Sequence, residues 1–189
     1  MREKCIALLG PYSRFKAVDG TAEHTALPDH AVDAIVAGQA FHWFDREQSK
    51  PEFKRILQQD GIVALIWNER KTSAPFEMDY EALILKHGRD YRQVDHRNTD
   101  EQHIASFFHP EPCQLRVFAN RQVFDFDGLQ GRLLSSSYMP GRVDAGFAAM
   151  NDDLEQLFKR YEQNGSVVIE YDTKVYTGRL TMPNLHTRF

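Results

Sequence analysis

The sequence predicts an α/β fold, in which strands of one sheet alternate with helices. Two almost wholly apolar runs, at residues 32–37 and 62–67, have the length and composition of buried strands. An amphipathic segment separates them, and apolar strands that alternate with helices are typical of a parallel sheet covered on both faces.

The connecting helix is predicted from its ends and its apolar spacing. Ser49 and Glu52 are spaced as a capping box, and Pro51 suits a first helical turn. Asp60–Gly61 gives the expected stop. The face that we expect to be buried consists of Phe53, Ile56 and Leu57.

The first twenty residues predict a short helix at 1–9, which Gly10 and Pro11 end, and a short strand at 14–18. The second half predicts further helices and two β-rich segments. The helices are expected at 76–87, at 99–108 with a Thr99/Gln102 capping box, at 127–134 with Asp127 as cap, and at 143–163. The strands at 114–126 and 167–176 fit an antiparallel pair added to the edge of the parallel sheet. We therefore expect a sheet core at 1–70, which helices and strands at 71–189 complete as one domain.

Composition excludes several classes of protein. The 189 residues are 42% apolar and 26% charged, as in globular proteins, and the net charge of -4 does not favour binding to nucleic acid. No apolar run approaches the roughly 20 residues that cross a bilayer. Cys5 and Cys113 are too few for a disulfide framework, and the eight histidines show no metal-ligand spacing. These features are typical of a cytoplasmic protein without a metal.

Three segments follow predicted strands, where the ligands of open α/β sheets bind. They are 19–23 (DGTAE), 38–43 (GQAFHW) and 68–70 (NER). Together with 27–29 (LPD), 133–140 (LLSSSYMP) and 170–172 (EYD), they resemble class I S-adenosylmethionine-dependent methyltransferases, and more narrowly the type 11 group. The resemblance implies a Rossmann-like sheet and S-adenosylmethionine as cofactor.

The resemblance also implies roles for individual residues. Gly20, Thr21, Ala22 and Glu23 match the segment beside the adenine, although many relatives have an aspartate where Thr21 stands. Gln39, Ala40 and Phe41 match the segment beside the methionine part of the cofactor. Trp43 and Tyr138 are the expected acceptor-pocket residues, and His42 is the candidate general base. Core packing is the alternative for the aromatic residues, and an orienting or packed histidine is the alternative for His42.

Two features of the family are absent from the sequence: the glycine-rich turn after a first strand, and the acidic residue that holds the ribose. A strand-helix-strand unit of at least roughly 30 residues would carry them. The sequence thus predicts an N-terminally truncated methyltransferase that acts on a small-molecule acceptor, with no nucleic-acid or membrane partner. A non-catalytic methyltransferase-like binding or structural module is the alternative, and a homodimer is left open.

Overall fold

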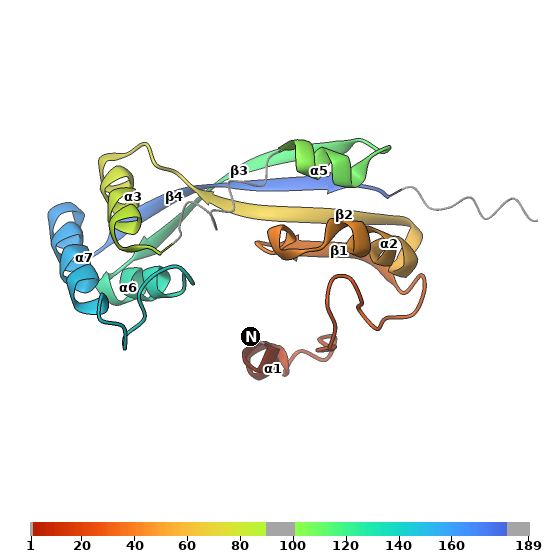
Figure 1. The fold of residues 1–189 in the computed structure, drawn as a ribbon, viewed down its shortest axis with the longest axis horizontal. Helices are drawn as coiled ribbons and strands as arrows, with labels where there is room; N and C mark the ends of the chain where they lie inside the picture. The colour runs from red at the N-terminus through yellow and green to blue at the C-terminus, as the bar shows by residue number, and fades with distance from the viewer. Residues whose placement is uncertain (1, 90–100, 181–189) are drawn as a thin grey trace, which may run out of the picture. The chain divides into compact units, whose positions relative to one another are not determined.

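The computed structural model describes residues 2–89 and 101–180, and these form a mixed α/β fold (Figure 1). Four strands form one sheet in the order β1-β2-β4-β3. The strands are β1 (Val32–Gly38), β2 (Leu57–Arg70), β3 (Cys113–Phe124) and β4 (Val167–Gly178). The helices are α1 (Arg2–Leu9), the short 3₁₀ helix η1 (Phe41–Trp43), α2 (Arg46–Ile56), α3 (Pro75–His87), α5 (Glu101–Phe108), α6 (Phe126–Leu134) and α7 (Phe147–Tyr161).

The chain divides into two compact units. Unit 1 comprises the described residues of 1–65, 102–114 and 177–189, and unit 2 comprises those of 66–101 and 115–176. β2 and β3 run from unit 1 into unit 2, whereas β4 runs from unit 2 into unit 1. β4 is therefore antiparallel to its neighbours β2 and β3, which confirms the predicted antiparallel pair.

In unit 1, β1 and β2 begin side by side. The backbone N–H groups of His30 and Ala31 donate to the carbonyls of Arg55 and Ile56, at 2.9 and 2.8 Å. Because these residues immediately precede the two strands, β1 and β2 run in the same direction, as predicted. β1 is an edge strand of the sheet, and its Val36 side chain is exposed.

The predicted strand at 14–18 is wrong, because these residues form no regular strand. A strand needs a neighbour that accepts its backbone N–H donors, and none of the four strands that the structure describes lies next to this segment in the sheet order. Local composition at 14–18 carried no information on such a neighbour.

The predicted ends of α2 are also wrong. The helix begins at Arg46, because Asp45 Oδ1 accepts hydrogen bonds from the backbone N–H groups of Glu47 and Gln48. Ser49, the predicted cap, is instead buried within the helix. The chain becomes extended at Leu57, so Asp60–Gly61 lies inside β2 instead of ending the helix.

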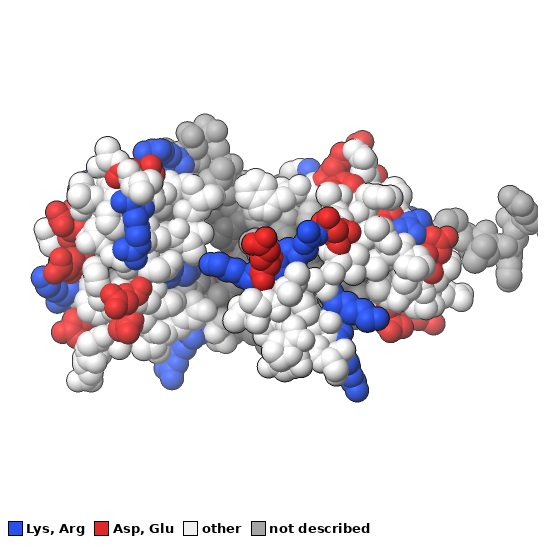
Figure 2. Space-filling view, turned by 90° about the horizontal axis from the view of Figure 1, so that it is seen from below, with Lys and Arg blue, Asp and Glu red and all other residues white. Residues whose placement is uncertain are grey.

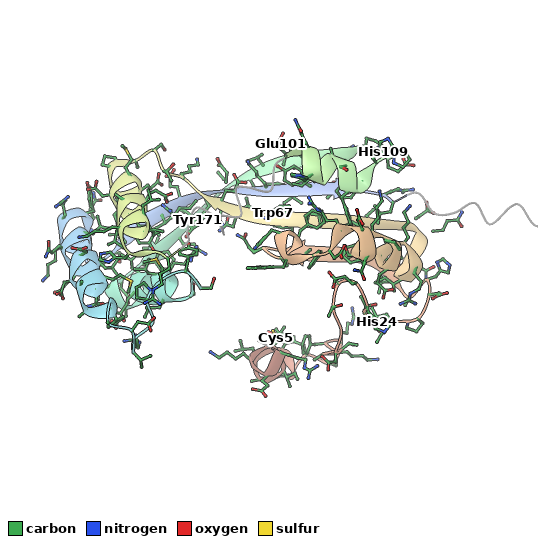
Figure 3. The ribbon with its side chains drawn as sticks, in the orientation of Figure 1. Cys5, His24, Trp67, Glu101, His109 and Tyr171 are labelled. Carbon is green, nitrogen blue, oxygen red and sulfur yellow. The ribbon has the colours of Figure 1, made fainter. Side chains whose placement is uncertain are left out.

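Unit 2 has a core in which α3, α6 and α7 pack against β4. Its most buried members include Leu129, Met150, Leu154 and Ile169. Figure 3 marks two other buried residues of this unit, Trp67 on β2 and Tyr171 on β4. The predicted helix at 143–163 is shorter, at Phe147–Tyr161.

Charged side chains of unit 2 also join its helices. Asp153 on α7 accepts hydrogen bonds from Lys86, at 2.6 Å, and from His87. Those two donors lower the pKa of the Asp153 carboxyl, and they connect α7 to α3. On the face in Figure 2, Lys and Arg are interspersed with Asp and Glu.

The cap of α6 lies two residues before the predicted one. Asp125 accepts a hydrogen bond from the backbone N–H of Gly128, at 2.8 Å, whereas Asp127 is already within the helix. The predicted cap of α5, Thr99, lies outside the described residues.

We expect Asp125→Ala to lower the free energy of unfolding by about 1 kcal/mol, because Gly128 loses its acceptor at the helix N-terminus. Asp127→Ala is the matched control and should have a much smaller effect. Urea denaturation of the two variants checks this expectation, and equal losses would contradict the assignment of Asp125 as the cap.

None of the helices within residues 2–89 and 101–180 is long and apolar enough to cross a membrane.

Candidate functional site

A tight turn in unit 1 carries the residues that the sequence placed beside an adenine. The Thr21 backbone N–H donates to the His24 carbonyl at 3.0 Å, and the His24 N–H donates back to the Thr21 carbonyl at 3.2 Å. The Ala22 N–H has no acceptor among the described residues. The Ala22 N–H is therefore available to donate a hydrogen bond to a nitrogen atom of an adenine ring.

Gly20 precedes this turn and has little space around it. A Cβ at position 20 would lie 2.8 Å from the His24 carbonyl oxygen and 3.0 Å from Thr25 Cα. Both contacts are with backbone, which cannot move aside without opening the turn. The structure thus gives Gly20 a steric role in shaping the candidate site.

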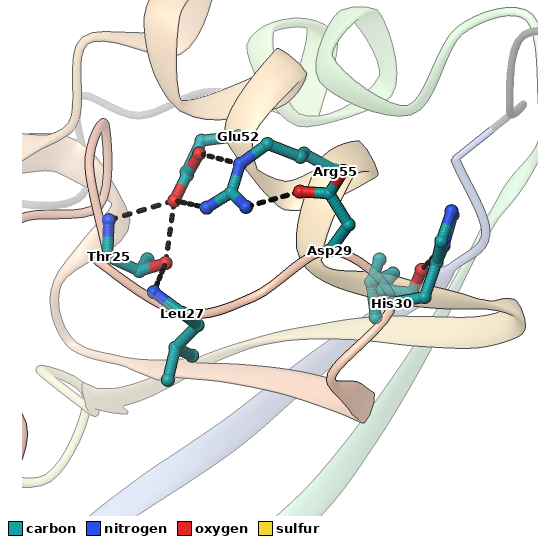
Figure 4. Close-up of polar contacts among 7 residues, drawn as sticks. Thr25, Leu27, Asp29, His30, Glu52 and Arg55 are labelled. Atoms are coloured by element: carbon teal, nitrogen blue, oxygen red, sulfur yellow. Dashed lines mark hydrogen bonds and ion pairs between the residues drawn. The ribbon is translucent and has the colours of Figure 1, made fainter.

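Two carboxylates hold the turn against α2. Glu23 Oε1 accepts a hydrogen bond from the Asp45 backbone N–H at 2.9 Å, and this bond is the main reason why the pKa of the Glu23 carboxyl is lowered. The second carboxylate is that of Glu52, whose Oε1 accepts from the Thr25 N–H at 2.8 Å and from the Thr25 hydroxyl at 2.6 Å (Figure 4).

Arg55 completes this polar network. Its Nε and Nη2 donate to the Glu52 carboxylate, both at 2.8 Å, and its Nη1 donates to Asp29 at 2.6 Å (Figure 4). Sequence reasoning did not identify this network, and the i,i+3 pair of Glu52 and Arg55 was the only local signal for it.

The loop after β1 has an unusual backbone. Gln39, which directly follows the strand, has φ of 53°, in the left-handed region that non-glycine residues adopt rarely. Such conformations often mark ligand-binding loops. The observation agrees with the predicted role of Gln39 and Ala40 beside the methionine part of the cofactor, a role that stays a prediction.

Phe41 is buried, and its ring meets the Phe107 ring edge-on at a centroid distance of 4.8 Å. The structure therefore supports the packing alternative for this side chain, and the cofactor contact of Phe41 stays a prediction. Two neighbours in η1 differ from it: His42 is half-buried, and the Trp43 side chain is 69% exposed. The His42 and Trp43 rings lie 4.9 Å apart. The general-base role of His42 and the acceptor-pocket role of Trp43 stay predictions.

Tyr138 belongs to unit 2, whereas every other predicted site residue belongs to unit 1. Its side chain is half-buried against the core of unit 2, and its carbonyl accepts a hydrogen bond from the Arg89 N–H at 2.8 Å. Tyr80 lies in the same core, where burial raises the pKa of its hydroxyl and Arg70 stacks over its ring. Arg70 ends the segment 68–70 that follows a predicted strand, but the sequence predicted no individual role for it.

No metal site accompanies these residues. In the part of the chain that the structure describes, no three His, Cys, Asp or Glu side chains gather closely enough to hold a metal ion. Cys5 and Cys113 are free thiols.

The segment that carries the turn at 20–24 and the loop at 38–43 is similar to known proteins. Residues 2–65 match the model of a methyltransferase domain family. An uncharacterised methyltransferase of Schizosaccharomyces pombe is 42% identical over 76 residues, which are 39% of this chain and 30% of that protein. An uncharacterised methyltransferase of Mycobacterium tuberculosis is 37% identical over 83 residues, which are 44% of this chain and 33% of that protein. The matches thus span about a third of the length of these curated relatives.

Solved structures show the same fold over nearly the whole chain. A candidate Type II methyltransferase from Anaeromyxobacter dehalogenans superposes with a TM-score of 0.62 at 18% identity, over 94% of this chain and 78% of that chain. A candidate methyltransferase from Bacillus halodurans gives 0.52 at 14% identity, over 95% and 79%. At these identities the likeness concerns the fold alone, and it confirms the predicted Rossmann-like α/β architecture.

Proposed function

We propose that the protein transfers a methyl group from S-adenosylmethionine to a small-molecule acceptor, because residues 2–65 match the model of a methyltransferase domain family. The single observation that carries the proposal is the family match, because it includes both the turn at 20–24 and the loop at 38–43. The sequence contains no signature of a particular acceptor.

The residues present fit one part of this cofactor. The Ala22 N–H is available to the adenine, and Gln39 and Ala40 lie on the strained loop that follows β1. The ribose is held in the family by a carboxylate at the end of another strand, and the described residues do not include its equivalent. In this proposal the turn at 20–24 and the loop at 38–43 supply the adenine and methionine sides of the cofactor site.

S-adenosylmethionine supplies an electrophilic methyl group on a sulfonium, so the protein has mainly to align the acceptor and exclude water. Trp43 is exposed, and its ring can face a cationic sulfonium. His42, beside it in η1, is the candidate to accept a proton from an acceptor hydroxyl or carboxyl. Both roles are parts of the proposal.

Titration of the 189-residue chain with S-adenosylmethionine in a calorimeter tests the proposal. We expect saturable binding, and Gly20→Ala should weaken it about tenfold because the new Cβ opens the turn at His24. Gly131→Ala is the matched control, since a Cβ at that position meets nothing within 4 Å. Absence of binding by a folded chain would contradict the proposal and favour the non-catalytic binding module.

A further inference from the structure

Unit 1 contains a cavity of about 680 Å³ beside α2. α2 contributes three cations to its lining, Arg46, Lys50 and Lys54, and α5 contributes His103, Ser106 and Phe107. None of these residues belongs to the predicted cofactor or acceptor sets. The cavity is thus a feature that the proposed methyl transfer does not use.

The three cations are spaced four residues apart, so they share one side of α2. Like charges at this spacing destabilise a helix unless carboxylates compensate them. Arg46 and Lys54 form no ion pair within the described residues, and Lys50 Nζ donates at 2.7 Å to the carbonyl of His109, a neutral group at the end of α5 (Figure 3). Burial and the neighbouring Lys54 lower the pKa of Lys50.

Two carboxylates also line the cavity, but neither forms an ion pair with these cations. Asp45 accepts hydrogen bonds from the backbone of its own helix, at Glu47 and Gln48, and from the Gln48 side chain. Glu47 forms no ion pair in the part of the chain that the structure describes. The positive charge on the lining therefore stays available to a ligand.

One wall of the cavity is apolar. Phe107 is buried, and Phe44 and Pro51 lie on the same lining. Small-molecule sites usually combine such a wall with a few convergent polar groups. We propose that this cavity binds a small molecule with an anionic group, a phosphate or a carboxylate, attached to an apolar ring, and that it does so independently of the methyl donor.

Calorimetry on the full chain, without S-adenosylmethionine, tests the inference with phenyl phosphate as the probe. We expect phenyl phosphate to bind more tightly than inorganic phosphate or phenol, because it uses both the cations and the apolar wall. Benzoate distinguishes the two anion sources: tighter binding of benzoate indicates a carboxylate ligand, and tighter binding of phenyl phosphate indicates a phosphate ester.

Two variants should move the affinity in opposite directions. Lys54→Gln should weaken binding about fivefold, and Glu47→Gln should strengthen it about threefold, because each removes one charge of known sign from the lining. Lys4→Gln, on α1, makes the same charge change outside the cavity and should leave binding unaltered. Urea denaturation of each variant verifies that it folds.

Failure of phenyl phosphate to bind at millimolar concentration would overturn the inference, as would equal losses for Lys54→Gln and Lys4→Gln. Because no methyl donor is present, these outcomes are separate from those that test the proposed function.

Discussion

Replacement of Glu52 by alanine is expected to lower the free energy of unfolding by about 3 kcal/mol. The Glu52 side chain is only 7% exposed, and it accepts hydrogen bonds from Thr25 and from the guanidinium of Arg55. Alanine would leave the half-buried Thr25 N–H and hydroxyl without their acceptor, and it would release the segment that follows the candidate adenine turn (Figure 4).

Urea denaturation followed by far-UV circular dichroism measures this loss. Glu47→Ala is the matched control, because Glu47 lies on the same helix, is exposed, and forms no ion pair among the described residues. Glu52→Gln should give an intermediate loss, since the amide keeps one acceptor oxygen but loses the charge. Equal effects of Glu52→Ala and Glu47→Ala would contradict the stabilising role of the network.

The same residue predicts a pH dependence of stability. The Arg55 side chain, and then Thr25, lower the pKa of the Glu52 carboxyl from 4.5 to about 2. The unfolded chain therefore takes up this proton near pH 4.5, whereas the folded chain resists it until about pH 2. The stabilisation is present above the unfolded pKa and is lost as the pH falls through the folded one.

The expected size of this loss is about 2 kcal/mol, after a discount for solvent around the partly exposed Arg55. Urea denaturation at several pH values between 2 and 6 measures it. Glu52→Gln should remove this part of the pH dependence. If the free energy of unfolding of that variant still falls with pH as steeply as in the parent protein, other carboxyls cause the pH dependence.

Local sequence correctly predicted the elements that an uninterrupted pattern of apolar residues marks. The apolar run at 32–37 became β1, and the helical spacing at 76–87 became α3, within one residue at their ends. The prediction failed where two residues of similar chemistry could each cap the same helix. Asp45 and Ser49 both suit a helix cap, as do Asp125 and Asp127, and the choice depends on backbone geometry that composition does not contain.

Long-range contacts explain the other errors. Gly61 was read as a helix stop, but it lies buried in β2, where a Cβ would come within 2.7 Å of Leu57 Cδ2. For the candidate site, the resemblance indicated the turn at 20–23. It did not indicate the hydrogen bond from Thr25 to Glu52, which joins residues 27 apart in the sequence. No periodicity or spacing rule predicts such a pair.

The second large effect is expected at Glu77, near the start of α3. Its side chain is 2% exposed, and its oxygens accept hydrogen bonds from three backbone N–H groups, those of Ser73, Ala74 and Glu170. The donors belong to the segment before α3 and to β4, so one carboxylate joins the helix N-terminus to the sheet of unit 2. Glu77→Ala should cost about 3 to 4 kcal/mol, because it leaves three donors without an acceptor.

Amide hydrogen exchange locates this loss as well as measuring it. We expect faster exchange at Ala74 and Glu170 in Glu77→Ala, together with a lower urea midpoint. Met78→Ala is the control, because Met78 is the next residue on α3 and its side chain is exposed. Glu77→Gln separates charge from hydrogen bonding: its amide oxygen can still accept, so a loss close to that of alanine would mean that the negative charge at the helix N-terminus dominates. Protection of Glu170 that persists in Glu77→Ala would show that β4 is held without this carboxylate.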